Sequence, residues 1–194
     1  MQARSENAAG KVFQVDRPSG LISGARQVAS PHCDARPAGT GIDLLVIHGI
    51  SLPPGEFGGA WIEQLFLGTL PTDAHPYFAT LRGLRVSAHL LIRRDGELLQ
   101  FVPFLKRAWH AGESVFQGRV TCNDFSIGIE LEGCDDVPYT EAQYAMLTAV
   151  SRALMSAYTG IAPERIVGHS DVAPGRKTDP GPAFDWVHFR ARLA

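Results

Sequence analysis

The chain of 194 residues lacks the features that mark several common classes of protein. Its only cysteines, Cys33, Cys122 and Cys134, are odd in number, widely spaced and outside any C-x-x-C arrangement. That pattern argues against a disulfide framework or a cysteine zinc knuckle, and it fits a reducing compartment. No apolar run reaches the roughly 18 residues of a membrane span, and the N-terminal stretch has no signal-peptide run. We therefore expect a cytoplasmic protein with no membrane partner.

The sequence also lacks an excess of charge of either sign. It has 18 Lys and Arg residues against 20 Asp and Glu residues, for a formal net charge of −2. Because nucleic-acid-binding domains carry a basic footprint, we expect no nucleic-acid partner, and nothing in the sequence indicates an obligate protein partner. The length suits one domain that needs no metal to hold its core together. We expect a flexible polar arm over residues 1–19 and a single domain over residues 20–194.

Several catalytic motifs are missing as well. The sequence contains no G-x-G-x-x-G, P-loop, H-E-x-x-H or G-x-S-x-G motif. Nucleotide enzymes, the common zincins and serine hydrolases are therefore poor fits.

The most informative segment that is present covers residues 168–181 and reads G-H-S-D-V-A-P-G-R-K-T-D-P-G. Prolines and glycines at this density predict a loop of fixed shape with neither helix nor strand. His169 and Asp179 are ten residues apart, so they share a target only if the loop folds back. That target is either a metal ion or a hydrogen bond between the two side chains. A solvated surface loop is the alternative.

Hydrophobic patterns predict a central sheet that delivers further polar groups. Residues 43–48 form a short apolar run, typical of a strand buried on both faces, with His48 at its end. A strand-end histidine that bonds a neighbouring carbonyl is an equally good interpretation of His48. Asp95-Gly96 separates two apolar runs and predicts an antiparallel hairpin that begins with residues 86–93. His89 lies within that first run, and we expect it to be a core histidine.

Residues 125–132 alternate strictly between apolar and other side chains, which predicts a strand. The second face carries small residues and Glu130, and we expect room there for water or substrate beside a general base. The next residue on that face, Glu132, is expected to be solvated. Residues 140–158 predict a helix with a capping box at its start and Gly160 as its C-terminal cap.

These elements leave five polar residues that could form one site. His48, His169 and Asp179 supply two imidazoles and one carboxylate, which is the ligand set of a catalytic zinc with its fourth position open. Zinc in such a site polarises a carbonyl and lowers the pKa of a water molecule to about 7. Glu130 would then move the proton, and Lys177 would stabilise a developing oxyanion.

Six segments stand in order along the chain: H-P-Y-F from His75, L-R-V-S-A-H from Leu84, L-I-R-R-D-G-E from Leu91, K-R-A-W-H-A-G from Lys106, C-N-D-F-S-I-G-I-E-L-E-G from Cys122 and R-K-T-D-P-G from Arg176. Together they resemble the zinc amidase superfamily that includes peptidoglycan recognition proteins and phage amidases. The match covers nearly everything from Gly20 onward. Within the superfamily, the sequence most resembles the cytoplasmic branch, whose members cut the amide bond between 1,6-anhydro-N-acetylmuramic acid and L-alanine during cell-wall recycling.

The resemblance implies an α/β (mixed α+β) fold, with a central mixed sheet flanked by helices. It also implies one zinc ion per chain, held by His48, His169 and Asp179, with Glu130 as the catalytic carboxylate and Lys177 as its partner. The implied substrate is a small molecule, an anhydro-muropeptide. Residues implied for the substrate cleft are Tyr77, Arg85 and Trp109, of which Arg85 suits a carboxylate of the peptide.

Two alternatives remain open at this point: a muropeptide-binding module without turnover, and an amidase that acts on intact peptidoglycan. Two positions also depart from the family pattern. Gly49 stands where the family has Asn, and Ser170-Asp171 stands where it has Cys-Asn. We expect Asp171 either to accept a hydrogen bond from the neighbouring ligand or to face water.

Overall fold

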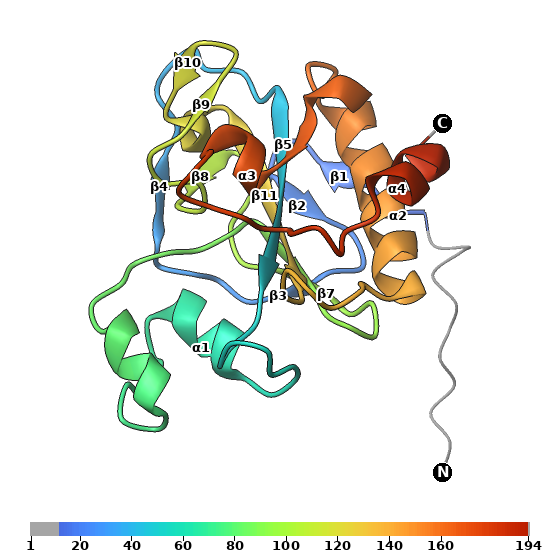
Figure 1. Ribbon diagram of the computed structural model, residues 1–194. Helices are drawn as coiled ribbons and strands as arrows, with labels where there is room; N and C mark the ends of the chain where they lie inside the picture. The colour runs from blue at the N-terminus through green and yellow to red at the C-terminus, as the bar shows by residue number, and fades with distance from the viewer. Residues whose placement is uncertain (1–11, 194) are drawn as a thin grey trace.

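The computed structural model describes residues 12–193, and a six-stranded mixed sheet runs through its centre (Figure 1). The strand order is β12-β5-β11-β6-β7-β3. The strand bounds are β3 Arg26–Gln27, β5 Leu44–Ile50, β6 Leu90–Ile92, β7 Leu98–Gln100, β11 Ser126–Glu132 and β12 Ile166–Gly168. The predicted mixed sheet flanked by helices is confirmed.

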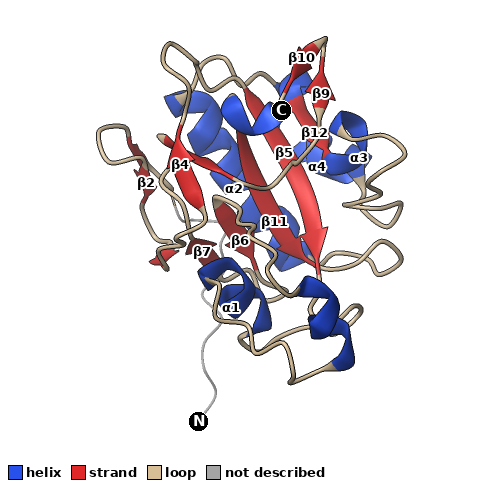
Figure 2. Ribbon diagram, turned by 90° about the vertical axis from the view of Figure 1, so that its left-hand side faces the viewer, coloured by secondary structure: helices blue, strands red, loops and turns tan. Residues whose placement is uncertain are grey.

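The first four strands in this order, β12, β5, β11 and β6, run parallel to one another. β7 returns antiparallel to β6, which confirms the hairpin expected at Asp95-Gly96, and β3 runs parallel to β7 on the outer edge. The first hairpin strand is shorter than the predicted 86–93. In Figure 2 the two long strands β5 and β11 lie side by side through the middle of the molecule. The residues of β5 up to His48 are fully buried, as expected for a strand covered on both faces.

The helices and the remaining short elements surround this sheet. The helices are α1 Trp61–Leu67, α2 Glu141–Ala157, α3 His169–Val172 and α4 Trp186–Leu193, and the 3₁₀ turns are η2 Pro76–Leu81, η3 Cys122–Asp124 and η4 Pro163–Arg165. Three small antiparallel pairs complete the fold: β1 Val15–Asp16 with β2 Leu21–Ile22, β4 Cys33–Ala35 with β8 Lys106–Ala108, and β9 Val115–Phe116 with β10 Arg119–Val120. Among the described residues, none of the helices is both long and apolar enough to cross a bilayer.

Helix α2 covers one face of the sheet, with α4 beside it (Figure 1). The capping box predicted at its start is confirmed, because the Thr140 hydroxyl accepts from the Gln143 amide while the Gln143 side chain accepts from the Thr140 amide. Leu147, Val150 and Leu154 of the helix are fully buried against the sheet. The helix ends at Ala157 with Tyr158 as its C-cap, so the prediction that Gly160 would cap it is wrong. Gly160 instead lies against the Asp43 backbone, where a Cβ atom would stand 2.8 Å from the Asp43 Cβ.

The N-terminal boundary differs from the expected polar arm. Phe13 is buried in the same core as α2, and β1 pairs with β2. Residues 13–19 therefore pack as part of the domain, because an aromatic side chain contributes more in a core than in solvent. The first 11 residues of the expected arm lie outside the described residues.

Candidate metal centre

The sheet register brings the first two candidate residues together. β5 and β11 are parallel neighbours, and Glu130 pairs with His48 in their register. Because side chains alternate along a strand, these two residues project from the same face of the sheet. On the other side of β5, β12 pairs Gly168 with Ile47 and leads directly into His169. The carboxyl ends of three parallel strands thus deliver His48, Glu130 and His169 to one edge, where open α/β sheets bind their ligands.

The segment 168–181 folds back as predicted, but it is not free of helix. The Ser170 amide donates to the Asp179 carbonyl at 3.0 Å, which brings Asp179 beside the start of the segment. The helix α3 occupies His169–Val172, because proline and left-handed glycine begin only at Pro174. Asp171 caps this turn by accepting from the Gly168 amide at 2.7 Å. Of the two roles expected for Asp171, the second is observed: the residue is exposed to water, and its carboxylate bonds to backbone and not to His169.

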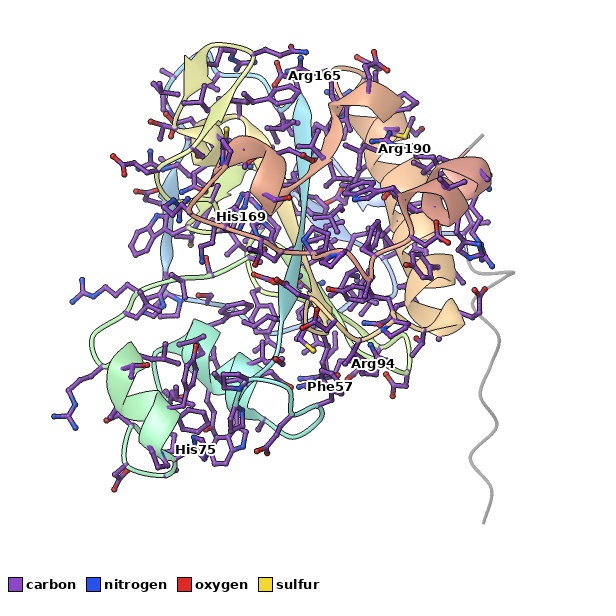
Figure 3. All side chains as sticks on the ribbon, in the orientation of Figure 1. Phe57, His75, Arg94, Arg165, His169 and Arg190 are labelled. Atoms are coloured by element: carbon purple, nitrogen blue, oxygen red, sulfur yellow. The ribbon has the colours of Figure 1, made fainter. Side chains whose placement is uncertain are left out.

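Three side-chain atoms converge at this edge of the sheet. His48 Nδ1 and His169 Nδ1 are 2.9 Å apart, and Asp179 Oδ2 lies 3.2 Å from the first and 3.0 Å from the second. These residues form a group whose ligand atoms could hold a metal ion. Ligand atoms around a tetrahedral zinc stand ~3.3 Å apart, given Zn–N and Zn–O bonds of about 2.0–2.1 Å. The donor set and its spacing therefore fit zinc, and these three residues would hold it with a fourth position free for water or substrate. Figure 3 shows His169 at the start of α3, near the centre of the molecule.

The outer nitrogen of each imidazole also has a partner. His169 Nε2 lies 3.2 Å from the Ala111 carbonyl, and His48 Nε2 lies 2.9 Å from His110 Nδ1. Sequence reasoning missed His110, because no motif connects it with the metal group. The signal that could have found it is Gly128. A Cβ at this strand position would fall within 2.5 Å of the His110 ring.

The space expected beside Glu130 for water or substrate is therefore occupied in part by protein. The His110 imidazole lies over Gly128, and its Nε2 is 3.1 Å from the Ser126 hydroxyl. The small residues of β11 are small because a ring packs against them. Glu132, expected to be solvated, is buried and accepts from the Gly58 and Arg94 amides and from Arg93. A carboxylate with three donors has no need of water, which is why that expectation is wrong.

His89 is a core histidine, as predicted. It is fully buried, its Nδ1 accepts from the Gly128 amide, and its Nε2 lies 3.1 Å from the Lys106 carbonyl and from Arg36. Burial lowers the pKa of His89 well below its usual range, with a further contribution from the Arg36 charge. Its ring centroid is 5.8 Å from that of His110, so it supports the layer behind the candidate metal group.

The environment of the site shifts the pKa values of its ionisable side chains in different directions. Burial lowers the pKa of His48 to about 4, which keeps the ring neutral and able to bind a cation. Burial would raise the pKa of Asp179, but hydrogen bonds from His169 and His48 outweigh it and lower that pKa. Burial raises the pKa of Glu130 well above its usual range, and the charge of Asp179 adds to this while Lys177 opposes it. A bound dication would shift all three toward their deprotonated forms.

Glu130 has an oxygen that no protein group satisfies. Within residues 12–193 its Oε2 is buried and has no hydrogen-bond partner, although the residue is only 9 % exposed. A buried carboxylate oxygen without a donor is costly in a folded protein. Glu130 lines the same cleft as the three candidate ligands. This arrangement fits a polar molecule held between Glu130 and a cation.

The candidate residues line one cleft of about 610 Å³. Glu130, Lys177, Tyr77 and Trp109 all border it, together with the three candidate ligands. Its volume is in the range of small-molecule sites. Arg85 does not border this cleft but lines an adjoining cavity of about 230 Å³, which shares Leu65, Leu81 and Leu84 with it.

The wall of the cleft after His48 is tied to the sheet. The Gly58 amide donates to Glu132 at 2.6 Å, and the Arg94 guanidinium lies over the Phe57 ring at 4.9 Å from its centroid (Figure 3). The segment that follows His48 is therefore anchored at its far end.

Comparison with known proteins identifies the family. A family model described as N-acetylmuramoyl-L-alanine amidase matches residues 38–182. The chain belongs to this amidase family. It is 64% identical over 175 residues to the 1,6-anhydro-N-acetylmuramyl-L-alanine amidase AmpD of Escherichia coli K12, which covers 90% of this chain and 95% of the relative.

Solved structures agree with the amidase fold. A crystal structure of a selenomethionine AmpD derivative superposes with a TM-score of 0.88 at 61% identity and covers 91% of this chain and 98% of the other. The amidase AmiD from Escherichia coli, solved with anhydro-N-acetylmuramic acid-L-Ala-D-γ-Glu-L-Lys, has a TM-score of 0.57 at 31% identity and covers 81% of this chain and 60% of the other. The fold implied by the sequence resemblance is confirmed.

The departure at Gly49 has a structural reason in this amidase. The residue follows His48 on β5, and a Cβ atom there would collide with the Tyr139 hydroxyl oxygen. That hydroxyl donates to the Pro180 carbonyl at 3.0 Å, next to Asp179. Gly49 thus leaves room for a tyrosine that holds the segment carrying the third candidate ligand.

Proposed function

We propose that this amidase is zinc-dependent and hydrolyses the amide bond between the lactyl group of 1,6-anhydro-N-acetylmuramic acid and L-alanine. Its substrates would be soluble muropeptides, which it would process in the cytoplasm during cell-wall recycling. The observation that carries the proposal is the meeting of His48 Nδ1, His169 Nδ1 and Asp179 Oδ2 in a cleft that also contains Glu130. The high identity to AmpD, whose name states the anhydro-muramyl substrate, supports this choice of bond.

The three candidate ligands would hold one zinc ion per chain. Bound there, zinc would supply Lewis acidity that polarises the amide carbonyl and acidifies an attacking water. Glu130 would accept the proton of that water and then deliver it to the leaving amine of L-alanine; its buried oxygen without a hydrogen-bond partner supports this role. The raised pKa of Glu130 suits this exchange, because a group that both accepts and releases a proton works best near the operating pH.

Lys177 supplies a second charge in the same cleft. It follows Arg176 in the segment that leads to Asp179, and its amide donates to the Ala173 carbonyl at 3.0 Å. Its charge already acts on Glu130 and on His48, so it lies near the reacting centre. We assign to it the stabilisation of negative charge on the carbonyl oxygen.

Two aromatic residues and one arginine are proposed to hold the rest of the substrate. Tyr77 is 38 % exposed on the cleft, and Trp109 borders it while stacking on His32 at a centroid distance of 6.0 Å. Aromatic faces of this kind suit a sugar ring or a peptide. Arg85, in the adjoining cavity, is assigned to a carboxylate of the stem peptide.

The deciding experiment compares soluble anhydro-muropeptides with intact sacculi as substrates of the zinc-loaded protein. We expect release of peptides with a free L-alanine amine from the soluble substrate only. Release from sacculi at a similar rate would favour an amidase of the intact wall. Binding of the muropeptide without any release, by a protein shown to contain zinc, would favour the non-catalytic binding module.

A further inference from the structure

Two consecutive residues, His110 and Ala111, contact both candidate imidazole ligands from behind. The His110 ring reaches His48 Nε2 at 2.9 Å, and the Ala111 carbonyl reaches His169 Nε2 at 3.2 Å. Both contacts are made to the ring nitrogen that faces away from Asp179. Neither His110 nor Ala111 has a role in the proposed reaction.

The segment that carries these two residues is itself fixed. Asn123, in η3, accepts from the His110 amide at 3.2 Å and from the Ala111 amide at 2.8 Å through one side-chain oxygen. The guanidinium of Arg176 donates to the Ala111 and Glu113 carbonyls. His110 is buried, with its ring over Gly128 and its Nε2 at 3.1 Å from the Ser126 hydroxyl. A ring held on three sides cannot turn without breaking one of these contacts.

The chemistry of a neutral imidazole then sets the direction of every hydrogen bond. A histidine that binds a metal through Nδ1 carries its proton on Nε2. His48 therefore donates to His110 Nδ1, which must accept. The remaining His110 proton sits on Nε2 and is donated to the Ser126 hydroxyl oxygen. On the other side, His169 Nε2 donates to the Ala111 carbonyl.

We propose that His110 is a positioning residue for the metal: through a hydrogen-bond chain from His48 to His110 to Ser126, it holds His48 in the tautomer that binds zinc. The Ala111 carbonyl does the same for His169, so one short segment orients both imidazole ligands. This inference rests on the zinc ligand set of the proposed function. It predicts that His110, which lies behind the cleft, affects the affinity for the metal and does not contact the substrate.

The first test measures the affinity of the folded, metal-free protein for Zn²⁺ alone, by competition with a chromophoric chelator. His110→Leu removes the acceptor and keeps an apolar side chain of similar size. We expect its zinc dissociation constant to rise about 10–100-fold, as is usual when an outer partner of a metal ligand is lost. His110→Asn, whose side-chain oxygen stands near the position of Nδ1, should recover most of the affinity. The matched control is His32→Leu, another buried histidine bonded to a carbonyl, which should leave zinc affinity unchanged.

A second measurement uses the parent protein and so does not depend on whether a variant folds. Nitrogen-15 chemical shifts of the zinc-loaded protein should show His110 with a bare Nδ1 and a protonated Nε2. The opposite tautomer, or a His110→Leu protein that binds zinc as tightly as the parent, would overturn the inference. A parent protein that binds no zinc at all would overturn the proposed function instead, so the two failures are distinguishable.

Discussion

Glu130 and His48 are paired residues of two neighbouring parallel strands, and both project toward the same cleft. The strand ladder fixes the proposed general base and a candidate metal ligand relative to each other, because the backbones of β5 and β11 are buried and hydrogen-bonded behind them. Neither residue depends on a loop for its position. Catalytic groups that sit on rigid elements are held more closely than groups on loops.

Replacing Glu130 by Gln should separate catalysis from metal binding. The variant keeps all three candidate ligands, so it should bind zinc, but it cannot carry a proton. We expect kcat to fall by about 10²–10⁴-fold, the usual contribution of a general base. Turnover of a soluble anhydro-muropeptide and zinc content are measured on the same sample. Glu132→Gln, on the same face of β11, is the control and should lower stability more than kcat; an active Glu130→Gln enzyme would remove Glu130 from the mechanism.

The variant His169→Ala should lose both metal and activity. It removes one of the three candidate ligands, and the remaining His48 and Asp179 would leave an incomplete zinc site. Metal analysis after dialysis and the amidase assay provide the readouts. His188→Ala is a suitable control, since His188 lies on α4 and pairs with Glu141 at 3.0 Å. A His169→Ala protein with full zinc content would show that the ligand set is wrong.

Lys177→Met is expected to lower kcat by about 100-fold with little change in KM, because the ammonium acts on charge that develops in the transition state. The side chain is exposed in the cleft, so the fold should tolerate the change. Zinc affinity is measured alongside the kinetics. If KM rises and kcat stays constant, Lys177 binds substrate and has no role in the chemical step.

The contact between Gly49 and Tyr139 can be tested by a double-mutant cycle. Gly49→Ala should destabilise the metal-free protein by about 1–3 kcal/mol, the usual cost of overpacking. Tyr139→Phe removes the hydroxyl, and with it the hydrogen bond to the Pro180 carbonyl, at a cost of about 1 kcal/mol. In the double variant the colliding atom is gone, so the sum of the two losses should exceed the measured loss in urea denaturation. Simple additivity would show that the backbone at Gly49 moves away without cost.

Acid should weaken one specific ion-pair network. Hydrogen bonds from Arg26 and then Arg93 lower the pKa of Glu63, which has an exposed side-chain fraction of 18%. A carboxyl group with a lowered folded pKa contributes stability above its unfolded pKa of about 4.3, and that contribution is lost as the pH falls through the folded value.

The corresponding variant is Glu63→Gln. At pH 7 it should be less stable than the parent by about 1 kcal/mol, since partly exposed pairs are screened. The difference should shrink as the pH falls below about 4.3. Urea denaturation at several pH values measures it. Glu97→Gln is the matched control, because Glu97 contacts the same two arginines from a more exposed position and should have a smaller effect.

The sequence predicted those parts of the fold that depend on local pattern. The apolar run at β5, the Asp95-Gly96 turn and the capping box at Thr140 each carry their signal within a few residues. The family resemblance then named a ligand set that the structure brings within hydrogen-bond distance. Segment 168–181 was predicted only in part, because the four residues His169–Val172, which precede the proline- and glycine-rich part, are free to form a helical turn.

What could not be predicted depends on contacts between distant segments. His110 appears in the sequence as a loop residue beside Trp109, and only its packing over Gly128 reveals its contact with His48. Glu132 looks like a solvated strand residue until the Gly58 and Arg94 amides are seen to surround it. In each case the partner lies on a segment far along the chain. Alternation along one strand gives no information about which segment covers it.

The separation of the candidate ligands along the chain also affects how the protein is made. His48 and His169 are 121 residues apart, and Asp179 follows later still. During synthesis the ribosome releases β5 and β11, with His48 and Glu130, well before the second imidazole is translated. A prematurely terminated copy would therefore carry the proposed base and one candidate ligand but could not cut a muropeptide, so hydrolytic capacity would appear only once the C-terminal segment has been translated and folded back.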